Sequence, residues 1–216
     1  MSQTLSEARS KSMLAEFGVP VIAERIVTDP ADAADAAAEL GFPVVAKLCG
    51  DGIAHKTERG LVRLGLRDAA AVDAAAASLW SAATPEDGPV SVLLSPMVSG
   101  IRELIAGLNL DPQFGMTVMV GVGGVLAEAI ADVAVRLVPI TEVDAEEMID
   151  DLRSQALLGE VRGEPAVDRA ALVGVLMGLS AAARAHPEII SADLNPLIIC
   201  DGRPVAVDAL VEVTAP

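Results

Sequence analysis

The chain has 216 residues, of which 52% are hydrophobic and 2% aromatic, and its formal net charge is −16. This length and apolar content are sufficient for a globular core, in one domain or in two closely joined subdomains. The acidic balance argues against sequence-independent binding to nucleic acid or to an anionic membrane, because both surfaces would repel the protein.

The same composition favours a cytoplasmic protein. The N-terminus lacks the apolar core of a signal peptide, and no stretch approaches the roughly 18 apolar residues that span a bilayer. Cys49 and Cys200 each lie within an apolar, strand-like run. We therefore expect buried thiols in a reducing compartment rather than a disulfide.

The first half of the chain predicts an opening helix and then a compact α/β unit. Apolar residues recur at helical spacing over 5–17, and Gly18 stands where that helix would end. A second helix over 31–40 leads into a strand over 43–49, which a loop follows. The remaining elements expected in this unit are a strand, a helix and a strand, over 61–66, 69–83 and 90–94.

The second half predicts another α/β unit. Strand-like runs cover 103–108 and 117–120, and a glycine loop follows at 121–124. Helices are expected around 144–152 and 168–184, before a C-terminal hairpin. The glycine loop matches neither a P-loop nor a convincing Rossmann fingerprint, so these two common nucleotide-binding folds are set aside.

The C-terminal hairpin carries a possible metal site. Two apolar runs flank Asp201-Gly202, a dipeptide typical of a type I′ turn. Counting outwards from this turn pairs Cys200 with Arg203 and places Asn195 opposite Asp208. An amide oxygen and a carboxylate side by side suit Mg²⁺, which uses few protein ligands. An ordinary turn, with Asp208 merely ending a strand, remains the alternative interpretation.

Lys47 and His55 are candidates for phosphate chemistry. Lys47 lies in an otherwise apolar strand, where an ammonium group is costly unless an anion or a carboxylate meets it. His55 lies in a glycine-containing loop, and a neutral imidazole nitrogen can attack phosphorus. The alternatives are a lysine that reaches solvent at the strand end and a histidine that is only a polar surface residue.

Seven segments, in this order, resemble one family closely. This family is the ATP-grasp subunit of ADP-forming acyl-CoA synthetases, which includes the acetyl-CoA synthetase (ADP-forming) β subunit and its kin. It is related to succinyl-CoA synthetase. The resemblance covers nearly the whole chain. The segments that carry it are Gly41-Phe-Pro-Val-Val-Ala-Lys47, His55-Lys-Thr-Glu58, Ser95-Pro-Met-Val, Arg102-Glu103-Leu-Ile, Asp111-Pro-Gln-Phe114-Gly115, Gly121-Val-Gly-Gly124 and Asp193-Leu-Asn195-Pro196.

The resemblance implies an ATP-grasp fold, in which two α/β subdomains grip the nucleotide. The N-terminal subdomain would cover 19–94 and the C-terminal subdomain 95–216, with the helix over 4–17 packing on the latter. The adenine would lie near the crossover, where Ser95 and Val98 belong to the nucleotide site. Because many relatives have an acidic or amide residue in place of Ser95, the preference for ATP or GTP stays open.

Further site residues follow from the same resemblance. It assigns Lys47 to the ATP phosphates, Glu103 to the nucleotide, and Asn195 with Asp208 to Mg²⁺. This last pair is the one that the hairpin count reaches independently.

The resemblance also implies a phosphoryl relay. His55 matches the family's second phosphohistidine, and Asp193 matches an acidic residue that orients it. The CoA-binding domain and the primary phosphohistidine are not visible in these 216 residues. We therefore expect a CoA-binding α subunit as partner, in an α₂β₂ assembly, with ATP/ADP and Mg²⁺ as cofactors.

Two other functions remain as alternatives. One is a nucleotide-sensing regulatory subunit without a relay, and the other is a carboxylate–amine ATP-grasp ligase. Neither alternative needs His55. The carboxylic acid that the enzyme would use cannot be read from this chain.

Overall fold

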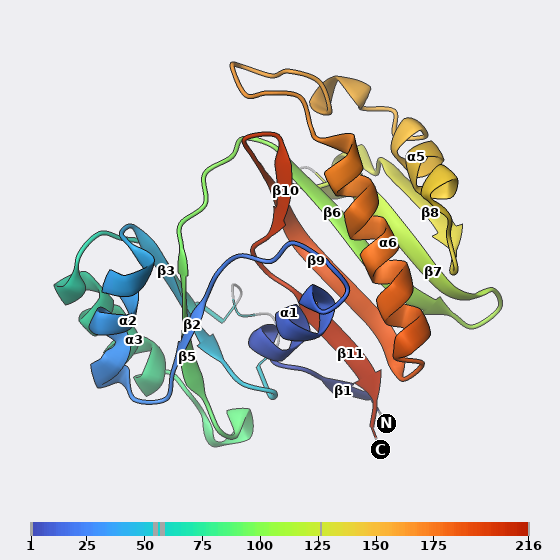
Figure 1. Ribbon diagram of the computed structural model, residues 1–216. Coiled ribbons are helices and arrows are strands. Elements are labelled where there is room, and N and C mark those ends of the chain that lie inside the picture. The colour runs from blue at the N-terminus through green and yellow to red at the C-terminus, as the bar shows by residue number, and fades with distance from the viewer. Residues whose placement is uncertain (1, 54–55, 57–58, 126, 216) are drawn as a thin grey trace. The chain divides into compact units, whose positions relative to one another are not determined.

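The computed structural model describes residues 2–53, 56, 59–125 and 127–215. The chain divides into two compact units, which we describe separately (Figure 1). Unit 1 comprises residues 1–3, 10–21 and 98–216, and unit 2 comprises residues 4–9 and 22–97. The opening helix α1 (Glu7–Ala15) is therefore shared, since its first turn belongs to unit 2 and the rest to unit 1. The subdomain limits 19–94 and 95–216 stay a prediction.

Unit 2 is an antiparallel sheet with helices packed against it. In the described residues four strands pair in the order β2-β5-β3-β4, with two α-helices, α2 and α3. The bounds are β2 Arg25–Val27, α2 Ala33–Leu40, β3 Val44–Cys49, β4 Val62–Leu66, α3 Ala69–Ser81 and β5 Ser91–Pro96, with short 3₁₀ turns at Pro30–Asp32 and Pro85–Asp87.

Strand β3 places Lys47 on the face opposite the hydrophobic core of unit 2. Successive residues of a strand point to opposite faces, and Val44, Ala46 and Leu48 pack into the cluster formed with α2 and α3. Val45, Lys47 and Cys49 therefore lie on the other face. All six residues of β3 are buried, and the strand is paired on both sides, with β5 and with β4.

Unit 1 is built on a larger antiparallel sheet. In the described part of the chain seven strands take part, in the order β1-β11-β9-β6-β7-β8, with β10 paired to β9. Helices α5 and α6 cover one face (Figure 1). The bounds are β1 Ser2–Thr4, β6 Glu103–Asp111, β7 Gly115–Val122, α4 Ala127–Ile130, β8 Val133–Leu137, α5 Glu142–Asp150, α6 Arg169–Ala185, β9 Ile189–Cys200, β10 Arg203–Ala206 and β11 Leu210–Thr214, with a 3₁₀ turn at Gln155–Leu157.

The long helix α6 anchors this sheet. It begins after Asp168, whose side chain caps the helix by accepting the backbone N–H of Ala171 at 3.0 Å. Its buried face includes Leu172, Leu176 and Leu179, at the spacing of one helix face. On the opposite face of the sheet, Asp193 and Asn195 of β9 are exposed, and these polar residues are discussed below.

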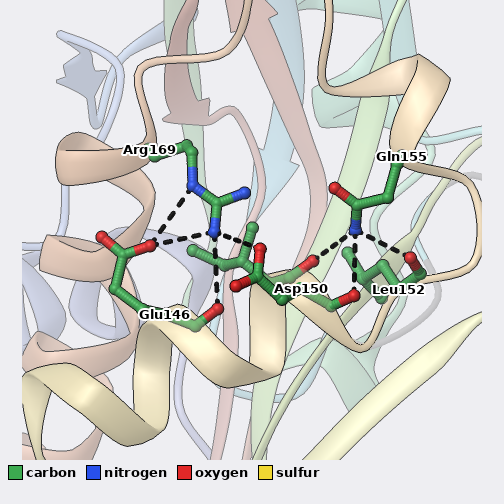
Figure 2. A network of polar contacts seen from close by, with 6 residues as sticks. Glu146, Asp150, Leu152, Gln155 and Arg169 are labelled. Carbon is green, nitrogen blue, oxygen red and sulfur yellow. Dashed lines mark hydrogen bonds and ion pairs between the residues drawn. The ribbon is translucent and has the colours of Figure 1, made fainter.

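Two side chains tie the end of α5 to its surroundings (Figure 2). The Arg169 guanidinium contacts the carboxylates of Glu146 and Asp150 at 2.9 and 2.7 Å. The Gln155 amide nitrogen donates to the carbonyls of Ile149 and Leu152, both at 2.7 Å. The Ile149 carbonyl belongs to the last turn of α5, where helical acceptors lack intrahelical partners, and Leu152 lies just beyond the end of that helix.

Most predicted elements are confirmed. The helices expected over 5–17, 31–40, 69–83, 144–152 and 168–184 all form, with ends shifted by a few residues. Strands β8 and β11, helix α4 and the short strands β1 and β2 were not predicted. Cys49 is buried as expected, whereas Cys200 is only partly buried, and both are free thiols. No helix among the described residues is long and apolar enough to cross a membrane.

Candidate functional site

The C-terminal hairpin forms as the sequence predicts. Asp201 and Gly202 both have positive φ angles, 47° and 81°, as a type I′ turn requires. Cys200 pairs with Arg203, and β10 continues in this register to the pair between Ala206 and Leu197. The predicted register is therefore confirmed over the whole of β10.

The register also brings Asp208 opposite Asn195. On the far side of Asp208, β11 pairs Leu210 with Asp193. Counting inwards from this pair, or outwards from the last pair of β10, reaches the same two residues. Against β6, the register of β9 shifts in this stretch, so β9 carries an irregularity where Asn195 lies. Such bulges commonly re-aim a side chain beside a functional site.

Asp193 interacts with both residues. Loss of water around its carboxyl group raises the pKa of Asp193, the negative charge of Asp208 raises it further, and a hydrogen bond with Asn195 opposes the rise. The three side chains are therefore neighbours. Asp193 and Asn195 are exposed and the intervening Leu194 is buried, so both lie on the face of the sheet away from the core. Their oxygen atoms are the hard donors that Mg²⁺ prefers, and a cation would relieve the repulsion between the two carboxylates.

Glu103 begins strand β6 on the same face. It pairs with Ile198 of β9, and its carbonyl accepts the backbone N–H of Gly123 at 2.8 Å. A Cβ atom on Gly123 would lie 2.9 Å from the Leu104 carbonyl oxygen, so only glycine allows this approach. The glycine loop thus packs against the start of β6, beside Glu103.

The preceding residue, Arg102, holds this end of the sheet to a distant loop. Its side chain is 3% exposed and its guanidinium contacts the Glu164 carboxylate at 3.2 Å. It also donates to the backbone carbonyls of Leu157, Gly159 and Pro165. Sequence reasoning did not identify these acceptors, which lie more than 50 positions further along the chain.

In unit 2, Lys47 meets a carboxylate. Its ammonium nitrogen lies 2.6 Å from Oε1 of Glu7, in the first turn of α1. Lys56 lies 2.9 Å from the other oxygen, Oε2, of the same carboxylate. All three side chains are less than a tenth exposed. Neither Glu7 nor Lys56 was singled out from the sequence, because residues 40 positions apart give no local signal of pairing.

The loop around Lys56 is held by further contacts. Asp51 accepts the backbone N–H of Ser6 at 2.9 Å and a guanidinium N–H of Arg9 at 2.7 Å. Arg59 forms two hydrogen bonds to the buried Asp87 carboxylate, at 2.7 and 2.8 Å. The predicted relay residue His55 lies outside the described residues, so its prediction stays untested.

The two residues expected at the crossover belong to different units. Ser95 is buried in β5, where it pairs with Val45 of β3. Val98 follows that strand and belongs to unit 1. Both therefore remain predicted members of a nucleotide site. In the described part of the chain no group of three or more His, Cys, Asp or Glu residues is arranged to hold a metal ion.

Comparison with known proteins identifies relatives over nearly the full length. A family model described as an ATP-grasp domain matches residues 1–213. The β subunit of acetate–CoA ligase (ADP-forming) I from Pyrococcus furiosus is 33% identical over 211 residues, which cover 96% of this chain and 91% of that subunit. Acetate–CoA ligase (ADP-forming) I from Archaeoglobus fulgidus is 34% identical, and the match covers 93% of this chain but 30% of that longer protein.

A solved structure shares the fold. Acetyl-coenzyme A synthetase 1 of Candidatus Korarchaeum cryptofilum, in complex with coenzyme A and Ca-AMPCP, superposes with a TM-score of 0.90 at 32% identity and covers 98% of this chain and 94% of that one. A second structure of that protein, with Mg-AMPPCP, has its phosphohistidine segment pointing towards the nucleotide-binding site. It gives a TM-score of 0.83 at 33% identity and covers 96% of this chain and 92% of that one.

Proposed function

Because the chain belongs to the ATP-grasp family, we propose that it is the nucleotide-binding β subunit of an ADP-forming acyl-CoA synthetase. The overall reaction is acyl-CoA + ADP + phosphate ⇌ carboxylate + CoA + ATP. The observation that carries the proposal is the likeness, over nearly the whole length of both chains, to a protein named as such a β subunit. The neighbouring Asp193, Asn195 and Asp208 support it.

This chain performs the phosphoryl transfer between the nucleotide and His55. In the ATP-forming direction, the bond from phosphorus to the imidazole nitrogen breaks as a bond to the β-phosphate oxygen of ADP forms. The imidazole leaves with its electron pair. Such a transfer depends mainly on positioning and on neutralising the charge of the phosphates.

The residues of each unit take distinct roles in this proposal. In unit 2, Lys47 binds the phosphates and Ser95 lies beside the base. In unit 1, Val98 and Glu103 contact the nucleotide, and Asp193 orients the histidine.

Asn195 and Asp208 would hold the Mg²⁺ ion. Their donor set fits, because one amide and one carboxylate oxygen leave the other coordination positions to water and to phosphate oxygens. When bound, the ion supplies positive charge to the phosphates. The proximity of Asp193 adds negative potential, which favours a cation at this place.

The complete enzyme needs a second subunit. We propose a CoA-binding α subunit as partner, in an α₂β₂ assembly located in the cytoplasm. The longer Archaeoglobus relative, of which this chain covers 30%, is consistent with a synthetase that requires additional domains. The choice of carboxylic acid would then depend mainly on the partner.

Labelling with γ-³²P-ATP and Mg²⁺ tests the proposal. The purified chain is incubated alone and together with its α partner, and the labelled protein is treated with acid and with alkali. We expect label that is acid-labile, alkali-stable and abolished by His55→Ala. The only other histidine, His186, pairs with Glu188 at 3.0 Å, so His186→Ala is the matched control and keeps the label.

One result would overturn the relay. If no label appears with an active partner present while ATP still binds, the chain senses or binds nucleotide without passing on a phosphoryl group. A chain that instead joins a carboxylate to an amine would turn over ATP without phosphohistidine, and His55→Ala would leave that turnover unchanged.

A further inference from the structure

Glu7 joins two lysines that come from separate parts of unit 2. It lies in the first turn of α1, where the helix dipole favours a carboxylate. One carboxylate oxygen pairs with Lys47 of strand β3 and the other with Lys56 of the loop that follows β3. The two ammonium groups are therefore held on opposite oxygens of a single carboxylate.

Burial makes this arrangement specific. The Glu7 side chain is 0% exposed, and the Lys47 and Lys56 side chains are 9% and 7% exposed. Buried charges interact more strongly than charges at the surface. If one of them is displaced, water cannot easily take the place of its lost partner. The position of each lysine thus depends on the same carboxylate.

The two lysines have different places in the proposed reaction. Lys47 is the residue proposed to bind the nucleotide phosphates. Lys56 directly follows His55, the proposed phosphoryl carrier, in the sequence. A carboxylate that binds both lysines connects the phosphate-binding strand to the segment that carries the acceptor.

We infer that Glu7 is a positioning residue for phosphoryl transfer, which sets Lys56 and Lys47 relative to each other without touching the reacting atoms. This inference rests on the proposed function. Small errors in the placement of reacting groups reduce the rate of transfer far more than they reduce nucleotide affinity. The role therefore predicts a change in the rate of the transfer step, with binding largely retained.

The neighbouring Asp51 offers a matched control. It contacts the same turn of α1 through Ser6 and Arg9, and it belongs to the same loop as Lys56. These contacts of Asp51 involve neither Lys47 nor Lys56. Asp51→Asn therefore weakens the attachment of the loop to the helix, whereas Glu7→Gln removes the shared charge on the lysines.

The test uses the assembled complex of this chain with its α partner. Single-turnover phosphorylation of His55 by γ-³²P-ATP gives the transfer rate, and calorimetry gives ADP affinity. We expect Glu7→Gln to slow transfer by about tenfold or more and to change ADP affinity by less than about threefold. Asp51→Asn stays within about threefold of wild type in both measurements.

A double-mutant cycle tests whether Glu7 acts through Lys56. Lys56→Met alone should slow transfer, and the Glu7→Gln/Lys56→Met double variant should be no slower than the worse single variant. Should Glu7→Gln fail to fold, as judged by circular dichroism, Glu7→Asp replaces it. The shorter side chain keeps the charge but cannot reach both lysines in the same way, so slower transfer is again expected.

Several outcomes overturn the inference. One is transfer at the wild-type rate in Glu7→Gln or Glu7→Asp. Another is a loss of transfer rate in Asp51→Asn equal to that in Glu7→Gln. The third is a double variant in which the rate losses of the two single variants multiply. Failure of the proposed function looks different, because the wild-type complex would then carry no phosphohistidine at all. Label on the wild type, together with an equal rate of labelling in Glu7→Gln, would refute the role of Glu7 alone.

Discussion

Replacing Arg102 by Met is expected to loosen the segment 155–165 and to lower the stability of unit 1. Arg102 is the residue before Glu103, and its buried guanidinium binds the Glu164 carboxylate and three backbone carbonyls. Methionine fills similar space but donates no hydrogen bond. The variant therefore leaves several acceptors without their donor.

The expected loss follows from these contacts. A hydrogen bond to a charged group contributes about 1.5–3 kcal/mol, but bonds made by one side chain do not add. Removing one partner of a buried charge network costs about 3–5 kcal/mol. Glu164 is 26% exposed and can regain water, so we expect the lower end, about 3 kcal/mol. For a chain of this size that corresponds to a fall in Tm of about 6–12 °C.

Thermal and urea unfolding measure the loss, and limited proteolysis within 155–165 shows where it acts. Arg102→Lys should fall between wild type and Arg102→Met, because a lysine cannot reproduce the planar fork of donors. Arg203→Met is the control, since Arg203 is 78% exposed and lies 3.9 Å from Asp168. That variant should lose less than about 0.5 kcal/mol. Equal losses in Arg102→Met and Arg203→Met would refute the reasoning.

Two further predictions concern packing and pH. Gly178→Ala should lower the free energy of unfolding by about 1–3 kcal/mol, because the new Cβ would lie 2.7 Å from the Phe17 carbonyl oxygen. The control Gly174→Ala, in the same helix, meets nothing within 4 Å and should raise the free energy of unfolding by up to about 1 kcal/mol. Urea unfolding measures both variants, and equal effects would exclude the close contact at Gly178. The second prediction concerns Asp87, whose pKa the Arg59 hydrogen bonds hold well below its ordinary value of 3.8. Because this depressed pKa belongs to the folded state, its stabilising contribution is present above the ordinary value and is lost as the pH falls through the folded-state pKa. Asp87→Asn should therefore be less stable than wild type at pH 7, and the difference should shrink in acid; a difference that is constant with pH would contradict this.

Local elements were largely predictable. Apolar periodicity located α2, α3 and α6, and Gly41 marked the end of α2, whereas α1 ends at Ala15, before the predicted Gly18. The Asp201-Gly202 turn predicted the register of its hairpin, since the turn type determines which residues face each other. That register also brought Asn195 and Asp208 together before any tertiary information was considered.

Some strands escaped prediction because they depend on their neighbours. Strand β8 lies at the edge of the sheet. Its alternating apolar residues Val133, Val135 and Leu137 are exposed, so they do not form the buried face that an apolar alternation usually indicates. Strand β2 is only three residues long and forms by pairing with β5. Short edge strands have little signal of their own, because their stability comes from the strand beside them.

The sequence by itself determined the helices, the hairpin and its register, and through motif resemblance the family to which the chain belongs. These features depend on residues close together in the chain, or on the order of motifs along it. Only the tertiary structure decided that Glu7 meets both Lys47 and Lys56, and that Arg102 binds carbonyls more than 50 positions away. A buried charge can be paired by any segment that the topology brings near it, so its partner is chosen by the fold and not by its neighbours in the sequence.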